Sequence, residues 1–196
     1  MAKAYVFDIG GVLIGLDLKA CIRAFQDILG FDRITELLDP YHQRGIYGEL
    51  EAGQLSADDF RARILAESRP GSAPEDVDRC MAALLTGMDP RTVAAVKQLE
   101  VPRYLLSNNN PISMARCREI LCENGLGEAF AAEFISSDMK LMKPSRAFYE
   151  EVLRCIGLPP GEIVFIDDNL ANVEGAKAVG IDARLFVPGT DIRAVL

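Results

Sequence analysis

Four polar signals in this chain are of the residue types that bind phosphate and a divalent metal. Three of them end apolar runs that predict strands, and the fourth precedes a proline. They are Asp8, Ser107, the pair Asp167-Asp168, and Lys143 before Pro144. Because ligands of an open α/β sheet bind outside the carboxyl ends of the strands, we expect these groups to converge there.

The first acid, Asp8, is followed by Gly10 and Gly11, and it could attack phosphorus to form an aspartyl phosphate. A carboxylate repels a phosphate, so a cation must help. Mg²⁺ held by Asp8 and Asp168 would screen this repulsion and align the two groups, with Asp167 as an outer-sphere partner.

The phosphoryl oxygens also need hydrogen-bond donors and positive charge around them. Ser107 and the backbone amides of Asn108 and Asn109 could supply neutral donors. Lys143 could supply the charge that stabilises the transition state. Catalysis of this kind consists mainly of positioning and electrostatics.

Each of these groups also has a purely structural interpretation that the sequence leaves open. Asp8 could be a turn or helix-cap residue, and Asp167-Asp168-Asn169 is typical of a helix N-cap. Residues 108–111 could be a turn before a helix, and Lys143-Pro144 an exposed loop. Two adjacent acids behind a buried strand repel each other unless a cation or donors intervene, which favours the metal site.

The elements that must position these residues alternate between strand and helix. Apolar runs predict strands at residues 5–7, 104–106, 133–135, 163–166 and 183–187. Three- and four-residue spacing predicts a helix from Leu18 to Leu29 that stops at Gly30, and helices follow most of the other strands. This rhythm is typical of an α/β fold with a Rossmann-like, parallel and right-handed sheet.

A long helical stretch interrupts the rhythm after the first strand. From residue 32 to 85 no strand alternation is visible, Ser56 is a predicted N-cap, and Pro74-Glu75 is a predicted helix start. We interpret residues 15–87 as a helical cap over the strand ends. Residues 1–14 and 88–196 then form the core.

Composition excludes several other classes of function. With 29 acidic and 21 basic residues, the formal net charge of −8 disfavours a nucleic acid or anionic membrane partner. A single histidine excludes a Ser-His-Asp hydrolase and a His-rich zinc site. No segment is apolar enough to span a bilayer and no leader is visible, so a cytoplasmic location is expected. The oligomeric state stays open.

Taken together and in order, these motifs resemble those of the haloacid dehalogenase (HAD) superfamily over nearly the whole chain. The matching segments are residues 8–13, 106–108, 143–144, 165–169 and 172–176. Residues 48–56 are similar to the cap of small sugar phosphatases such as α-D-glucose-1-phosphate phosphatase. The resemblance implies a Rossmann-like core with a helical (C1-type) cap. It also implies these roles: Asp8 as nucleophile and metal ligand, Ser107 and Asn108 as phosphate binders, Lys143 as charge stabiliser, and Asp168 as metal ligand.

One position departs from the superfamily pattern. Most phosphatases of this type carry a second Asp two residues after the nucleophile, where its carbonyl binds magnesium and its side chain protonates the leaving oxygen. Here that residue is Gly10, which keeps the carbonyl ligand and lacks the acid. General acids typically contribute about 10²–10⁴ in rate, so we expect a substrate whose leaving oxygen departs readily, such as a sugar 1-phosphate.

Polar residues of the expected cap could take part as well. His42 could donate the missing proton. Glu49, Glu51 and Arg44 could touch sugar hydroxyls, although a charged outer helix face is the simpler interpretation.

The sequence therefore predicts a Mg²⁺-dependent phosphatase for a small phosphorylated metabolite, and the resemblance implies a sugar phosphate. One alternative is a phospho-ligand binding or regulatory module that lost turnover with the acid at Gly10. Another is a dehalogenase, which uses the same nucleophile without a metal. Asp167-Asp168 disfavours it, because a dehalogenase has no need for two further carboxylates near its nucleophile.

Overall fold

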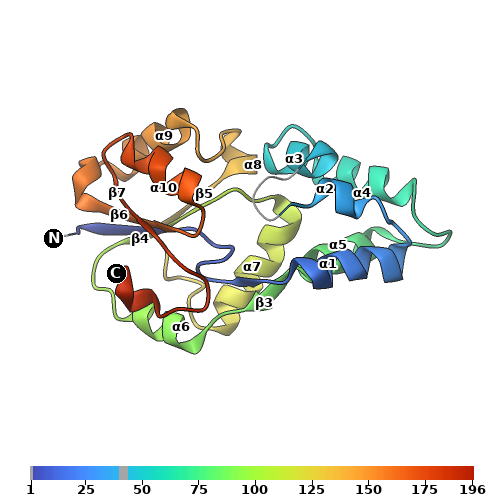
Figure 1. Cartoon of the computed structure of the whole chain (residues 1–196), viewed down its shortest axis with the longest axis horizontal. Helices are drawn as coiled ribbons and strands as arrows, with labels where there is room; N and C mark the ends of the chain where they lie inside the picture. The colour runs from blue at the N-terminus through green and yellow to red at the C-terminus, as the bar shows by residue number, and fades with distance from the viewer. Residues whose placement is uncertain (1, 40–43) are drawn as a thin grey trace.

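The protein is built around a five-stranded parallel sheet with the strand order β5-β4-β1-β6-β7 (Figure 1). The computed structural model describes residues 2–39 and 44–196. The strands are β1 (Ala4–Phe7), β4 (Arg103–Ser107), β5 (Ala132–Ile135), β6 (Ile163–Asp167) and β7 (Asp182–Leu185). Since β1 lies between β4 and β6, the residues that follow these three strands are neighbours at one edge of the sheet.

Helices cover both faces of the sheet, as Figure 1 shows. This double cover explains why every residue of β6 is buried and why its sequence is a continuous apolar run. One face packs against α6 (Pro90–Lys97), α7 (Pro111–Glu123) and the 3₁₀ turn η3 (Ile192–Ala194). The other packs against α9 (Arg146–Ile156), with the 3₁₀ turn η2 (Pro160–Glu162) after it, and α10 (Leu170–Lys177).

Short polar side chains start the core helices where the chain leaves the sheet. Asn110 Oδ1 accepts from the amide of Ser113 at 3.0 Å and caps α7. Asn169 Oδ1 accepts from the amide of Ala171 at 2.9 Å and caps α10. This N-cap sets the start of α10 at Leu170.

The predicted strands are confirmed, with small shifts at their ends. β4 extends to Ser107 and β6 to Asp167, one residue beyond each apolar run. The last strand spans Asp182–Leu185 where residues 183–187 were expected. Backbone hydrogen bonds to the neighbouring strand fix these ends. The pattern of apolar side chains carries no information on those bonds.

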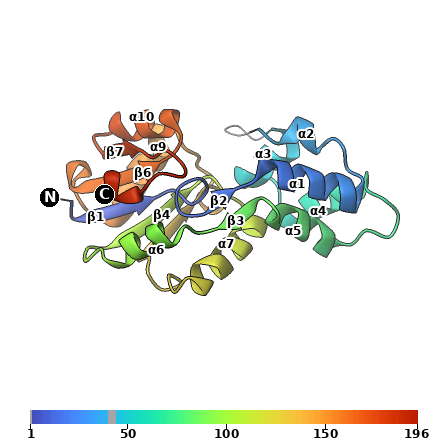
Figure 2. The same ribbon diagram turned by 60° about the horizontal axis from the view of Figure 1, so that its bottom comes forward.

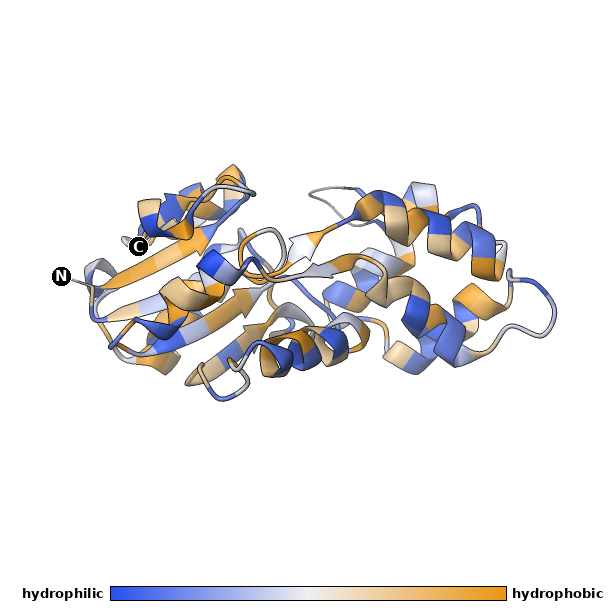
Figure 3. Ribbon diagram, turned by 90° about the horizontal axis from the view of Figure 1, so that it is seen from below, coloured by the Kyte–Doolittle hydropathy of each residue, from blue (hydrophilic) through white to orange (hydrophobic). Residues whose placement is uncertain are grey.

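The cap is a group of helices with an apolar core of its own, set beyond the carboxyl ends of the strands (Figures 1 and 2). Ser56 caps α4 and Pro74 begins α5, as predicted. The described elements are α1 (Leu18–Ala24), a π-helical turn η1 (Phe25–Leu29), α2 (Ile34–Leu37), α3 (Gly45–Glu51), α4 (Ala57–Leu65) and α5 (Pro74–Ala82). In Figure 3 the apolar colouring concentrates in the sheet, whereas the cap helices alternate between apolar and polar residues.

Two short strands join the cap to the core, and neither is predicted from the sequence. β2 (Gly15–Leu16) pairs antiparallel with β3 (Leu85–Gly87) where the chain enters and leaves the cap (Figure 2). Strands of two and three residues with glycine are too short to show an alternating pattern. The cap boundaries expected at 15 and 87 coincide with the start of β2 and the end of β3, and the division into cap and core stays a prediction. Among the described residues, no helix combines the length and apolarity that crossing a bilayer requires.

Candidate active site

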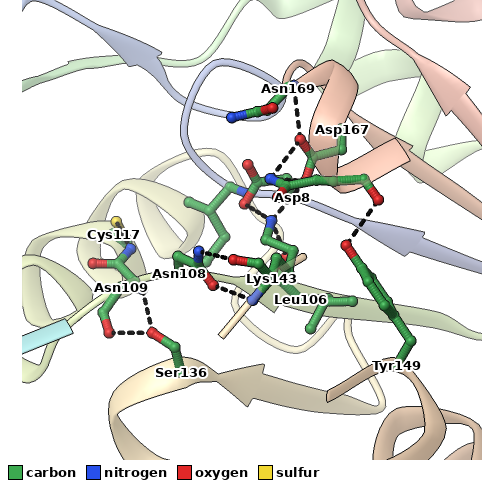
Figure 4. A network of polar contacts seen from close by, with 12 residues as sticks. Asp8, Leu106, Asn108, Asn109, Cys117, Ser136, Lys143, Tyr149, Asp167 and Asn169 are labelled. Atoms are coloured by element: carbon green, nitrogen blue, oxygen red, sulfur yellow. Dashed lines mark hydrogen bonds and ion pairs between the residues drawn. The ribbon is translucent and has the colours of Figure 1, made fainter. Parts of the chain in front are cut away.

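The carboxyl ends of β1, β4 and β6 bring the predicted site residues to one cavity of about 240 Å³. Asp8 follows β1, Ser107 ends β4, and Asp168 follows β6. Lys143 reaches the cavity from the loop after α8 (Ser136–Met139). Figure 4 shows Asp8, Lys143 and Asp167 pointing toward one another.

The ammonium of Lys143 has three acceptors in a buried position. Its Nζ lies 2.7 Å from Oδ2 of Asp167, 3.0 Å from Oδ1 of Asp8 and 2.9 Å from the carbonyl oxygen of Leu106. Burial alone would lower the pKa of Lys143, but the attraction of Asp167 and Asp8 outweighs it and raises that pKa. Lys143 is therefore a fixed positive charge beside Asp8.

Asp167 is fully buried, and both of its carboxylate oxygens are engaged. Oδ1 accepts hydrogen bonds from the amide of Asn169 at 2.8 Å and from Nδ2 of Asn172 at 3.1 Å. Oδ2 accepts a hydrogen bond from the ammonium of Lys143. The hydroxyl of Tyr149 donates to the carbonyl of Asn172 at 2.8 Å. This network fits the outer-sphere position that was predicted for Asp167 (Figure 4).

The acids form a cluster that suits a divalent cation. One carboxylate oxygen each from Asp8, Asp167 and Asp168 lie within 4.8 Å of one another. Burial raises the pKa of Asp8 to about 7 and that of Asp168 to about 6; nearby acids add to both shifts, and Lys143 opposes them. Since Asp167 is occupied, Asp8 and Asp168 remain as hard oxygen ligands, and these suit Mg²⁺. Gly10, the predicted carbonyl ligand, lines the same cavity.

Gly11 allows the first loop to approach Asp168. Its φ of +78° lies in the left-handed region, and a Cβ at this position would lie 2.2 Å from Oδ2 of Asp168. Both the backbone conformation and the space therefore require glycine. Of the two glycines in this loop, Gly11 thus serves the packing of a carboxylate.

One of the two amides that were expected to bind phosphate is used differently from the prediction. The side chain of Asn108 holds the backbone of Lys143: Oδ1 accepts from its amide at 2.8 Å, and Nδ2 donates to its carbonyl at 2.9 Å. Only the backbone of Asn108 is left for phosphate. The amide of Asn109 donates to Oγ of Ser136 at 2.9 Å, so its predicted use for phosphate was wrong. Ser107 is buried and lines the cavity, and its phosphate role stays a prediction.

The cap contributes Tyr47 and Glu51 from α3 to the wall of this cavity. The simpler interpretation, that Glu51 belongs to a charged outer face of the helix, was therefore wrong. Burial raises the pKa of Glu51 to about 8, the charge of Asp8 adds to the shift, and Lys143 opposes it. The spacing of Tyr47, Leu50 and Glu51 places them on one helix face, and this was the available signal.

Two other polar residues named for the cap, Glu49 and Arg44, do not line the cavity. Glu49 pairs with Arg63 at 3.2 Å on the surface, and Arg44 is exposed. His42 lies outside the described residues.

The protein belongs to the haloacid dehalogenase-like hydrolase family, whose model matches residues 2–180. The chain is 30% identical over 201 residues to a D-ribitol-5-phosphate phosphatase of Bacteroides thetaiotaomicron, covering 100% of this chain and 97% of that protein.

Two solved structures share the fold over almost their whole length. A HAD family enzyme of Bacteroides thetaiotaomicron, in complex with magnesium and inorganic phosphate, has a TM-score of 0.86 and 28% identity, with 97% of each chain covered. A predicted HAD-like family hydrolase of Porphyromonas gingivalis has a TM-score of 0.85 and 29% identity, with 98% of this chain and 94% of that chain covered. The expected α/β fold is confirmed.

Proposed function

We propose that this protein is a magnesium-dependent phosphatase that hydrolyses a small sugar or polyol phosphate through an aspartyl phosphate on Asp8. The observation that carries the proposal is the grouping of the buried Asp8 and Lys143 with the half-buried Asp168 in one small cavity. Two relatives support the proposal. One is the phosphatase that is 30% identical to this chain, and the other is the similar structure that holds magnesium and phosphate.

In this proposal each residue has a role that follows from its contacts. Asp8 attacks phosphorus, and the charge of Lys143, held by Asp167, stabilises the phosphoryl oxygens. Ser107 and the backbone amide of Asn108 bind those oxygens. Asp8, Asp168 and the Gly10 carbonyl would hold magnesium, which would screen the repulsion between the carboxylate and the phosphate.

The same residues favour turnover over the two alternatives. A phospho-ligand binding module needs the donors and the metal, but it has no need for a buried carboxylate 3.0 Å from a lysine ammonium at the centre of the cavity. A dehalogenase, which works without a metal, has no use for Asp168 as a third carboxyl group in the cluster.

The substrate is small, because about 240 Å³ lies below the roughly 300–1,000 Å³ of cavities that take drug-sized ligands. Two classes are in question. The sequence resemblance favours a sugar 1-phosphate, whose anomeric oxygen leaves readily. The relative's name favours a polyol 5-phosphate, whose leaving oxygen is an ordinary primary alcohol and needs a proton.

The test is a panel of phosphoesters with and without Mg²⁺, including α-D-glucose 1-phosphate, D-ribitol 5-phosphate and p-nitrophenyl phosphate. We expect Mg²⁺-dependent release of phosphate from one of the sugar or polyol esters. Asp8→Asn should abolish it without unfolding the protein, since the substitution keeps the shape of the side chain and removes the nucleophile. Tight phosphate binding without turnover of any ester would overturn the proposal and favour the binding module.

A further inference from the structure

The first loop of the site offers no proton donor for the leaving group. At Gly10 a Cβ would meet Cδ1 of Leu16 at 3.2 Å, so an apolar side chain from β2 occupies the space beside this residue. Leu16, Leu84 and Leu85 make this part of the cavity lining apolar. A proton for the departing oxygen must therefore come from elsewhere.

The geometry of phosphoryl transfer points to the cap. The attacking and leaving oxygens lie roughly in line on opposite sides of phosphorus. Asp8 attacks from the end of β1, so the leaving oxygen faces away from the sheet. The cap residues that line the cavity on α3 are Tyr47 and Glu51.

Among the described residues that line the cavity, Glu51 is the acid that is assigned neither to the nucleophilic attack nor to the metal. Asp8 and Asp168 belong to the nucleophile and the metal. Burial raises the pKa of the Cys117 thiol to about 11 and that of Tyr47 well above its usual value, so both are poor proton donors. No hydrogen bond or ion pair in the described part of the chain engages the Glu51 carboxyl.

The backbone of Glu51 is fixed to the core, which sets where its side chain leaves α3 at the wall of the cavity. Its carbonyl accepts from Oγ of Ser136 at 2.6 Å, and the same hydroxyl accepts from the amide of Asn109. Two residues on, Gly53 has a φ of +67°, and a Cβ there would lie 2.1 Å from the carbonyl oxygen of Ser137. The end of α3 therefore rests directly on the start of α8.

The charges around Glu51 favour its protonated form near neutral pH. Burial and the carboxylate of Asp8 raise its pKa to about 8, and Lys143 opposes them. The neighbouring elements bring few free charges: on α4, Arg63 is held by Glu49, and on α2, Glu36 is held by Arg33. On α8, Asp138 is exposed, and the other titratable groups of the lining are Tyr47, Cys117 and Asp168.

We propose that Glu51 is the general acid that protonates the leaving oxygen, in the place of the acid that Gly10 lacks. This inference rests on the proposed phosphatase function. As an oxygen of Asp8 bonds to phosphorus, the phosphorus–oxygen bond to the alcohol breaks and that oxygen takes the proton of Glu51. The Glu51 carboxylate then accepts a proton from the water that attacks the aspartyl phosphate. This second step releases inorganic phosphate and restores both side chains.

The test compares two leaving groups in Glu51→Gln. With an alkyl ester such as D-ribitol 5-phosphate, kcat should fall about 10²–10⁴-fold, because the alkoxide leaves without a proton. With p-nitrophenyl phosphate, whose leaving group needs no acid, the fall should be less than about tenfold. Glu51→Asp should keep part of the alkyl activity. In the wild type, alkyl hydrolysis should decline above about pH 8, and Glu51→Gln should lack this decline.

Matched variants separate the inference from its foundation. Glu49→Gln changes a carboxyl on the same helix that pairs at the surface, and it should leave both activities unchanged. Equal losses on both esters, or none, in Glu51→Gln would overturn the role of Glu51 while the phosphatase stands. A selective loss in His42→Gln instead would assign the proton to that residue. No Mg²⁺-dependent turnover by the wild type would overturn the proposed function itself.

Discussion

Lys143 and Asp167 form an ion pair of 2.7 Å in which the side chains are 1% and 0% exposed. Because water reaches neither group, the charge of Asp167 depends on Lys143 for compensation, and the charge of Lys143 depends on Asp167 together with Asp8. The pair lies behind Asp8, so it fixes the position of the ammonium that faces the nucleophile.

Lys143→Met should abolish hydrolysis and also destabilise the protein. It leaves Asp167 as an uncompensated buried charge, which typically costs about 3–5 kcal/mol. Adding Asp167→Asn should restore most of the stability without restoring activity. Urea unfolding and phosphate release measure the two effects; recovery of activity in the double variant would contradict the assigned charge role of Lys143.

Magnesium affinity should rise with pH between about 5 and 8. Protons compete with the cation for Asp8 and Asp168, whose pKa values burial raises to about 7 and about 6. Calorimetric titration at several pH values measures this dependence. An affinity that is constant over this range would exclude these two carboxylates as the ligands.

The same shifts predict how the metal-free protein responds to pH. A carboxyl whose pKa is raised by folding keeps a proton that the unfolded chain has released, so stability falls as pH rises through this window. For Asp8 the window runs from about 3.8 to about 7. Thermal melts should therefore show a larger stabilisation by Mg²⁺ at pH 8 than at pH 5.

Gly11→Ala should weaken magnesium binding through Asp168, because the added Cβ would overlap that carboxylate. We expect a loss of about 10–100-fold in affinity, as for other changes that disturb the orientation of a ligand. Gly189→Ala is the matched control, since Gly189 also has a positive φ, of +87°, but its Cβ would meet nothing within 4 Å. Equal metal affinity in the two variants would show that backbone strain alone matters.

Gly10→Asp should fold, because the nearest obstacle is the end of the Leu16 side chain, which is 46% exposed. If Glu51 already supplies the proton, the variant gains little on alkyl esters in the wild-type background. In the Glu51→Gln background it should restore much of the lost turnover. A large gain in the wild type with no restoration in Glu51→Gln would contradict the assigned acid.

The sequence predicted the central elements because their signals are local. The continuous apolar run of β6 and the cap at Ser56 can be read within a few residues. The convergence of Asp8 and Asp168 followed from a general rule about strand ends. The roles of these residues in catalysis remain predictions.

The signals that were missed depend on contacts between distant segments. The amide of Asn109 is used by Ser136, 27 residues later. Glu51 approaches the site only because α3 folds back onto α8, whose position in the core no local pattern reports. β2 and β3 pair across most of the cap, and each is too short to be recognised alone.

The hydroxyl of Ser136 touches both halves of the molecule, through the amide of Asn109 and the carbonyl of Glu51. A displacement of the cap from the core would break this bridge and remove a support of the loop after β4. The position of the cap over the cavity and the position of that loop are therefore coupled through one hydroxyl group.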